Sequence, residues 1–134
     1  PVTYVKPHGA LYNQACRDER FARPVAAVAL VNGLAVVGLP DSVLARVCAE
    51  LGVRFVPEGF ADRRYRADGS LVPRSEADAL LHDPVEALDQ IDRLVRERGV
   101  RSVCVHGDSP GAVGFAKAIR EGLLDRGYSL KRIG

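Results

Sequence analysis

Three short stretches of the sequence concentrate the side chains that could transfer protons or bind an anion. They are residues 6–13, 58–65 and 106–111. Two of the three histidines and one of only three lysines of the chain fall within them. Histidine and carboxylate side chains act as general acids and bases, whereas Lys and Arg hold carboxylates and phosphates. We therefore expect the chemistry of this protein to lie in these stretches.

In the last stretch, His106 and Asp108 stand on either side of Gly107. A turn at the glycine could direct both side chains at one ion or substrate group, as two metal ligands or as a base with its orienting carboxylate. The alternative is that Asp108 caps the helix that follows and that His106 packs. Backbone N–H groups around Gly107 and Ser109 could hold a phosphate or carboxylate at the start of this helix. The sequence contains no GxxxxGK[ST] pattern, so this turn is not a Walker A loop.

The first stretch places Lys6 and His8 on either side of Pro7, directly after an apolar run. Lys6 could hold an anion or polarise a carbonyl group, and His8 could serve as acid, base or ligand. A solvated lysine and a histidine in a turn are the competing interpretation, because an isolated Lys-x-His pattern also occurs by chance. These residues alone leave both interpretations open.

The middle stretch contains Glu58, Asp62 and Arg63, and it is followed by Asp68 and Arg74. A carboxylate here could act as a general base, and an arginine could clamp a substrate carboxylate with two parallel hydrogen bonds. The alternative is a loop laced with surface ion pairs. That alternative competes most strongly for Asp68 and Arg74, and least for Glu58, which lies nearest to the end of a predicted strand.

Short apolar runs alternate along the chain with stretches in which apolar residues recur at helical spacing. Ser or Asp precedes most of these helical stretches and Gly ends most of them, as expected for capped helices. The predicted strands are residues 2–5, 34–37, 53–56 and 102–105, and a fifth could begin at Ser129. The predicted helices are residues 18–31, 42–51, 84–98 and 109–126. This alternation is typical of a parallel sheet with helical crossovers.

In parallel α/β folds, the loops that leave the carboxyl ends of the strands lie at one end of the sheet, where ligands bind. The three polar stretches follow the first, third and fourth predicted strands. The third histidine, His82, precedes a helix and is expected to be incidental. We therefore expect a set of polar side chains to surround one cavity: Lys6, His8, Glu58, Asp62, His106 and Asp108.

The composition favours an ordinary globular enzyme that acts on a small molecule. The chain has 134 residues, 47% of them hydrophobic, and a net charge of only +2, so we expect residues 1–134 to form a single domain. No basic run interleaved with aromatics indicates nucleic-acid binding. The longest apolar run, residues 25–31, is far shorter than the roughly 20 residues of a membrane span. Three cysteines without a CxxC pair indicate neither disulfides nor a zinc knuckle, and we expect a cytoplasmic protein.

Three motifs, in order, resemble those of the LamB/YcsF family: VKPHGALYN at residues 5–13, EGFADR to DGSLVPR across residues 58–74, and CVHGD at residues 104–108. The resemblance spans nearly the whole chain. It implies an α/β fold, an incomplete seven-stranded parallel β/α barrel of the glycoside hydrolase/deacetylase-like kind, of which this chain supplies the C-terminal half. The opening motifs of the family, an Asp-x-Asn strand and the His-containing strand ends after it, have no counterpart here. The segment from Arg101 to Cys104 is also shorter than in typical relatives.

The resemblance further implies one component of an enzyme that opens 5-oxo-L-proline to L-glutamate with hydrolysis of ATP, bound with Mg, and that works with separate B and C subunits. The motif positions expected to be catalytic are Lys6, His8, Glu58, Asp62, His106 and Asp108. Those expected to bind substrate are Asn13, Arg63, Gly107 and Ser109. Two alternatives stay open: a metal-dependent amidohydrolase or deacetylase with His8, His106 and Asp108 as ligands, and a non-catalytic subunit that binds a substrate or partner. A homo-oligomer is also compatible with the sequence.

Overall fold

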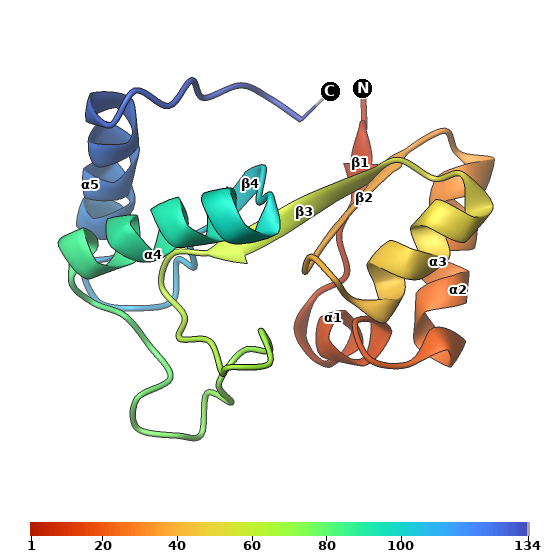
Figure 1. Cartoon of the computed structure of the whole chain (residues 1–134), viewed down its shortest axis with the longest axis horizontal. Coiled ribbons are helices and arrows are strands. Elements are labelled where there is room, and N and C mark those ends of the chain that lie inside the picture. Colours follow the sequence, from red (N-terminus) through yellow and green to blue (C-terminus); the bar gives the residue numbers. More distant parts are fainter. Residues whose placement is uncertain (134) are drawn as a thin grey trace. The chain divides into compact units, whose positions relative to one another are not determined.

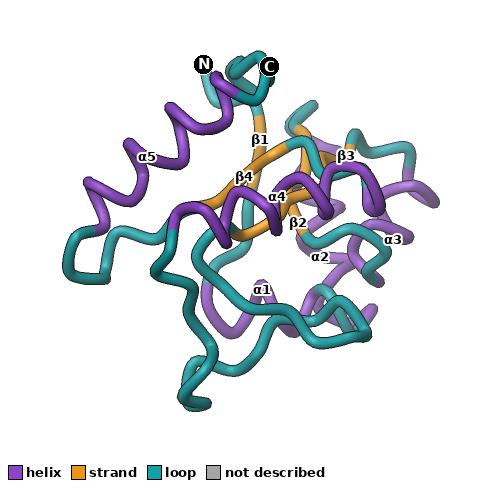
Figure 2. Tube along the Cα trace, turned by 60° about the vertical axis from the view of Figure 1, so that its left-hand side comes forward, coloured by secondary structure: helices purple, strands orange, loops and turns teal. Residues whose placement is uncertain are grey.

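The computed structural model describes residues 1–133, and strands and helices alternate along most of this part of the chain (Figures 1 and 2). The strands are β1 (Tyr4–Val5), β2 (Ala35–Gly38), β3 (Phe55–Phe60) and β4 (Ser102–Cys104). The helices are α1 (Gly9–Ala15), α2 (Glu19–Val31), α3 (Val43–Leu51), α4 (Pro84–Arg98) and α5 (Ala112–Asp125).

The four strands form one sheet in the order β1-β2-β3-β4. The first three run parallel, with Tyr4 opposite Ala35 and Val36 opposite Phe55. β4 continues the parallel sheet, because the N–H of Arg101 donates to the carbonyl of Pro57 and, further along, Ala61 donates to Cys104. Neighbouring strands are thus consecutive in sequence, which is the winding of β/α barrels rather than of doubly wound sheets. The predicted α/β class with a parallel sheet is confirmed.

Capping residues set most of the helix ends where the sequence predicts them. Asp18 accepts a hydrogen bond from the N–H of Arg20 at the start of α2, and Ser42 accepts one from Ala45 at the start of α3. Gly52 ends α3 in the left-handed conformation, with φ of 69°. Both devices satisfy backbone groups that the helix leaves unpaired.

Three elements differ from the prediction. Residues 9–15 form α1 instead of a loop, because Gly9 adopts a φ of 58° and so turns the chain directly from β1 into a helix. Helix α5 begins at Ala112, after a left-handed Gly111, and neither Asp108 nor Ser109 caps it. Residues 129–133 form no strand. The hydroxyl of Thr3 instead donates to the carbonyl of Ile133, so this segment is bonded by a side chain and not by the backbone hydrogen bonds of a sheet.

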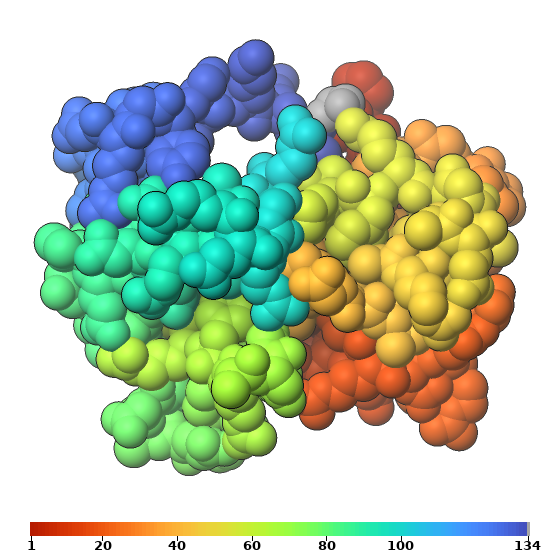
Figure 3. Space-filling view, viewed as in Figure 1, coloured from red at the N-terminus to blue at the C-terminus, as the bar shows by residue number. Residues whose placement is uncertain are grey.

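Contacts divide the chain into two compact units. The first unit comprises residues 1–58, 98–102 and those from Arg132, and the second comprises residues 59–97 and 103–131. The boundary falls inside β3, after Glu58, and inside β4, after Ser102. Within the second unit, Figures 1 and 3 show α4 lying between α5 and the long loop that precedes α4. Two isolated antiparallel bridges, Arg63 with Leu80 and Tyr65 with Leu71, shape this loop.

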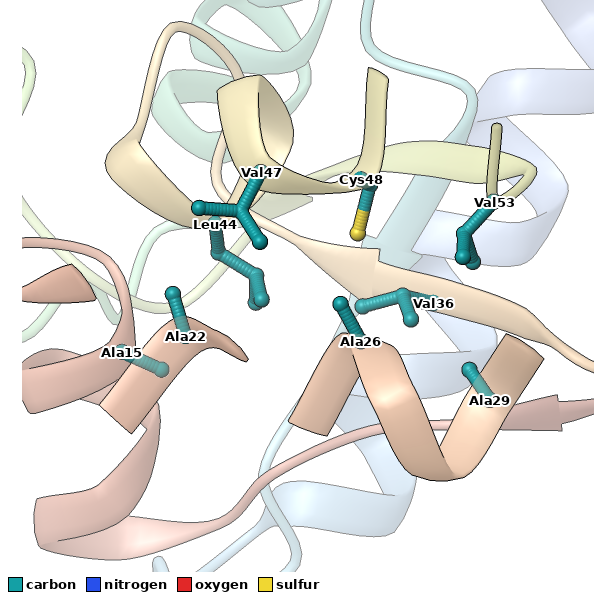
Figure 4. Close-up of a cluster of buried hydrophobic side chains, with 9 residues drawn as sticks. All are labelled: Ala15, Ala22, Ala26, Ala29, Val36, Leu44, Val47, Cys48 and Val53. Atoms are coloured by element: carbon teal, nitrogen blue, oxygen red, sulfur yellow. The ribbon is translucent and has the colours of Figure 1, made fainter. Parts of the chain in front are cut away.

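The core of the first unit is built from alanines on α1 and α2 that pack against larger side chains (Figure 4). Ala22, Ala26 and Ala29 recur at helical spacing on one face of α2 and are fully buried. They face Val36 of β2 and apolar residues of α3, among them Leu44. Small side chains let the helices and the sheet approach closely.

The core of the second unit lies between α4 and α5 and includes Leu88, Ile91, Ile119 and Leu123. A Cβ atom added at Gly122 would lie 2.3 Å from Cδ1 of Leu88, so a larger residue there would force the Leu88 side chain to shift. None of the helices within residues 1–133 combines the length and the apolar character needed to cross a membrane. The cytoplasmic location stays a prediction.

Candidate functional site

The first unit contains a buried cluster of Lys6, Tyr12 and Glu58, which we name the Lys6 cluster. Lys6 follows β1, and Glu58 lies in β3. The Nζ atom of Lys6 lies 2.7 Å from Oε1 of Glu58, and the hydroxyl of Tyr12, on α1, donates to Oε2 at 3.2 Å. Nζ also lies 5.9 Å from the centre of the Tyr12 ring, a cation–π distance. Glu58 is only 3% exposed, so its charge is balanced inside the protein rather than by water.

Two other expected residues of the first unit lie at the surface of α1. His8 is the N-terminal capping residue of this helix, but its side chain makes no capping hydrogen bond. Asn13 is exposed and donates to the carbonyl of Gly9 within the same helix. Cys16, at the end of α1, is buried, and burial raises the pKa of its thiol. The buried polar contacts of this region therefore centre on Lys6 and Glu58.

The second unit contains a pair formed by Asp62 and His106. Nδ1 of His106 lies 3.0 Å from Oδ1 and 2.9 Å from Oδ2 of Asp62, and the backbone N–H of His106 also donates to Oδ2 at 2.9 Å. The imidazole stacks on Phe60, with ring centres 5.5 Å apart. An ionised carboxylate only accepts hydrogen bonds, so Nδ1 carries the proton and Nε2 is left as a proton acceptor. The His106 side chain keeps 28% of its surface exposed.

Hydrogen bonds from α4 and the long loop fix the chain around Asp62. The buried amide of Gln90, on α4, donates to the carbonyls of Phe60 and Arg63 at 3.0 and 2.8 Å. The N–H of Leu81 donates to the carbonyl of Asp62 at 3.0 Å. Both sides of Asp62 are therefore held, and its carboxylate meets His106 with little conformational freedom.

Asp62 and His106 line a pocket of about 240 Å³ whose wall belongs entirely to the second unit. The turn after β4 and the start of α5 form one side, including Ser109 and Gly111, and the end of the long loop forms another, including His82. A base with a fixed tautomer faces a cavity large enough for a small molecule. This arrangement can remove a proton from water or from a substrate.

The structure gives His106 a different orienting carboxylate from the one that sequence spacing suggested. Asp62, 44 residues away, holds the imidazole, whereas Asp108 forms an exposed ion pair with Arg74. The hydrogen bond from Arg74 is the main reason why the pKa of the Asp108 carboxyl is lowered. The interpretation of Asp108 as a helix cap is also wrong, because α5 has no side-chain cap. A catalytic role for Asp108 stays a prediction.

Arg63 is buried and incompletely bonded. Its Nη2 atom donates to the carbonyl of Val72 at 2.6 Å, but its Nε atom is buried without a hydrogen-bond partner among the described residues. Burial, and then the positive charge of Arg74, lower the pKa of Arg63. Of the other residues expected to bind substrate, Ser109 lines the pocket. Gly107 is exposed and directly follows His106 in the sequence.

The structure thus brings Lys6 together with Glu58, and Asp62 together with His106. That these two pairs share one cavity stays a prediction. His82, which the sequence indicates to be incidental, lines the pocket of Asp62 and His106, because the neighbouring Leu81 bonds to Asp62 in a way that the sequence does not show. Within residues 1–133, no three His, Cys, Asp or Glu side chains are grouped so that they could hold a metal ion.

Comparison with known proteins gives the family. The model of the LamB/YcsF family matches residues 1–134. The A subunit of 5-oxoprolinase from Paracidovorax citrulli is 49% identical over 97% of this chain and 57% of its own length, and that of Streptomyces coelicolor is 46% identical over 97% and 58%. The crystal structure of the lactam utilization protein from Thermus thermophilus matches with a TM-score of 0.82 and 39% identity, over 98% of this chain and 57% of that one. The chain spans about 57% of the length of these relatives, and it belongs to the LamB/YcsF family.

Proposed function

We propose that this chain is part of the A subunit of a 5-oxoprolinase, which opens 5-oxo-L-proline to L-glutamate with hydrolysis of ATP and acts with B and C subunits. The names of the relatives support the reaction. The observation that carries the proposal is the Asp62–His106 pair at the wall of a pocket, because lactam hydrolysis requires a base that activates water.

We also propose that these four strands are the C-terminal part of an incomplete seven-stranded β/α barrel. The consecutive strand order supports this, as does the match to only 57% of the Thermus protein. In a β/α barrel, the loops after the strands form the active site, and Asp62 and His106 lie directly after β3 and β4.

In the proposed mechanism, Nε2 of His106 accepts a proton from water as the water oxygen bonds to the lactam carbonyl carbon. The carboxylate of Asp62 stabilises the imidazolium that forms and keeps the ring oriented. General base catalysis of this kind contributes roughly 10²- to 10⁴-fold to the rate. Residues of the turn before α5 line the same pocket, and a backbone N–H group of this turn could stabilise the negative charge that develops on the oxygen.

ATP, when bound, supplies a phosphoryl group that activates the otherwise unreactive lactam oxygen. The turn from Gly107 to Ala112 suits an anionic group, because the left-handed Gly111 opens a helix whose first N–H groups lack a side-chain cap. From its position in the family motif we assign Arg63 to the carboxylate of 5-oxoproline. Its Nε is buried without a partner among the described residues, and Arg63 does not line the pocket beside His106. Within the proposal, we assign Lys6 to charge stabilisation and a carboxylate, Glu58 or Asp108, to further proton handling.

The test uses the full-length protein reconstituted with its B and C subunits, with glutamate and ADP measured together. The unaltered protein should form glutamate only when 5-oxoproline and ATP are both present. His106→Gln should lower kcat by 10²-fold or more, whereas Arg120→Gln, on the exposed surface of α5, should leave it unchanged. Binding of 5-oxoproline without turnover in any combination would instead support a carrier role. Stoichiometric metal in the active protein would favour the metal-dependent alternative.

A further inference from the structure

The pocket beside His106 has a second histidine in its wall. Among the residues that the structure describes, Asp62, His82 and His106 are the only ones lining this pocket that carry a carboxylate or an imidazole. His106 is committed through Nδ1 to Asp62. His82 is exposed, and no hydrogen bond or ion pair of its imidazole is seen within residues 1–133. The pocket therefore contains one imidazole held as a base and another that is available to exchange protons with solvent.

His82 is held in place by the chain on both sides. On its N-terminal side, Leu80 bridges to Arg63 and the N–H of Leu81 donates to the carbonyl of Asp62 at 3.0 Å. On its C-terminal side, the carboxylate of Asp83 accepts a hydrogen bond from the N–H of Val85 at 2.9 Å and starts α4. The backbone next to His82 is thus anchored to Asp62, the residue that orients His106.

Opening a lactam requires two proton transfers. Water loses a proton as its oxygen bonds to the carbonyl carbon, and the ring nitrogen must gain a proton as the carbon–nitrogen bond breaks, because an amide anion is a very poor leaving group. The first transfer falls to His106 in the proposed function. The second needs an acid that can reach the same bound ring from the pocket wall.

We propose that His82 is this acid, an inference that rests on the proposed function. The carbon–oxygen bond forms as Nε2 of His106 takes the proton of water. The carbon–nitrogen bond then breaks as the carbon regains a carbonyl group, its electron pair stays on nitrogen, and the nitrogen takes a proton from the His82 imidazolium. The phosphoryl group on the former lactam oxygen passes to a second water and leaves as inorganic phosphate. Afterwards His106 returns its proton to solvent and His82 regains one, so that both residues are ready for the next turnover.

The test compares His82→Ala and His82→Gln in the full-length protein with its B and C subunits. Both should lower kcat roughly 10²-fold with little change in KM, and the fall of kcat toward high pH, where an acid loses its proton, should disappear. Added imidazole should restore part of the activity of His82→Ala, because the pocket is open and the lost group is small. A merely structural role would not give this rescue. Arg120→Ala on α5 is the matched control: it should keep the kcat and the pH profile of the unaltered protein and show no response to imidazole.

The outcomes separate this inference from the function on which it rests. If the unaltered protein does not convert 5-oxoproline, the proposed function and this inference both fail. If the unaltered protein is active but His82→Ala keeps kcat within threefold, only the assignment of His82 fails. A large loss in both variants that imidazole does not rescue, with KM raised, also overturns it and leaves His82 as a residue that shapes the pocket.

Discussion

In the first unit an acid and a base are buried against each other, whereas in the second unit a carboxylate and an imidazole meet at the wall of a pocket. Glu58 is satisfied through both oxygens, by Lys6 and by Tyr12. Both oxygens of Asp62 are also bonded, Oδ1 to the ring of His106 and Oδ2 to its ring and its backbone N–H. The difference lies in the partner, because His106 retains a second nitrogen for a ligand.

The comparison shows that the burial of a charged pair does not by itself identify a catalytic pair. A buried ion pair fixes the positions of the elements that carry it, and breaking it is costly because one charge is left without a partner. A carboxylate that orients a histidine beside a cavity instead fixes a tautomer that chemistry can use. The two pairs should therefore respond differently to the same kind of substitution. Changes to the Lys6–Glu58 pair should lower stability markedly, whatever they do to turnover, whereas changes to the Asp62–His106 pair should lower turnover with little loss of stability.

The largest expected effect is on turnover. Asp62→Asn should lower kcat roughly 10²- to 10⁴-fold, because the amide can donate to Nδ1 and so leaves the proton on Nε2, where it blocks proton uptake. The free energy of unfolding should change little, since asparagine fills the same space and still offers an acceptor to the N–H of His106. Steady-state kinetics and urea unfolding of the full-length protein measure the two quantities. An Asp62→Asn protein with normal kcat would show that His106 needs no orienting carboxylate.

The next effect should appear in stability. Glu58→Gln should lower the free energy of unfolding by about 3 kcal/mol, because it removes the carboxylate charge that lies 2.7 Å from the mostly buried ammonium group of Lys6. Lys6→Met should do the same to Glu58, and the double variant should recover much of the loss. Urea unfolding of the four proteins gives the coupling energy. If the single variants unfold normally yet lose kcat, then the Lys6 cluster is primarily catalytic and the contrast between the two units is wrong.

Local signals predict most of the framework that supports both pairs. Caps such as Ser42 and stops such as Gly52 act within one turn of helix, so the sequence displays them directly. The placement of Lys6, Glu58 and His106 at or near strand ends follows in the same way from the alternation of strands and helices. Helix α1 escaped this reasoning because Pro7 and Gly9 together indicate a loop, whereas here the glycine turns the chain into a helix.

The partners of the polar side chains could not be predicted from spacing. The sequence places Asp108 two residues from His106, but the hydrogen bonds join His106 to Asp62 across 44 residues. His82 lies at the pocket because the N–H of the neighbouring Leu81 donates a hydrogen bond to the carbonyl of Asp62. This hydrogen bond likewise depends on how the long loop folds back. Such pairings are settled by tertiary packing, and no local pattern in the letters encodes them.

A smaller effect on stability tests how closely α4 and α5 pack in the second unit. Gly122→Ala should lower the free energy of unfolding by about 1 kcal/mol, because the clash of the new methyl group with Leu88 outweighs the better helix propensity of alanine. Gly114→Ala, on the same helix, has nothing within 4 Å of the added Cβ and should raise stability by up to about 1 kcal/mol. Thermal unfolding of the two variants measures the difference. Equal shifts in Tm would mean that α4 and α5 pack less closely than the contact at Leu88 requires.

The smallest expected effect concerns Asp108, the exposed carboxyl that sequence spacing offered as one possible partner of His106. Arg74→Gln should raise the pKa of the Asp108 carboxyl toward its ordinary value, because the hydrogen bond from Arg74 is the main cause of its lowering. Titration of the labelled carboxyl carbon by NMR measures this pKa, and Arg64→Gln, which removes the ion pair with Glu86, is the matched control. A carboxyl whose pKa is lower in the folded than in the unfolded protein stabilises the fold at pH values above the unfolded-state pKa. This stabilisation is lost as the pH falls through the folded-state pKa, so the contribution of the Arg74–Asp108 pair should vanish in acid. If the pKa of Asp108 stays low in Arg74→Gln, a group other than Arg74 lowers it. If kcat also falls sharply in this variant, Asp108 and Arg74 belong to the catalytic site, which then extends beyond His106 and His82.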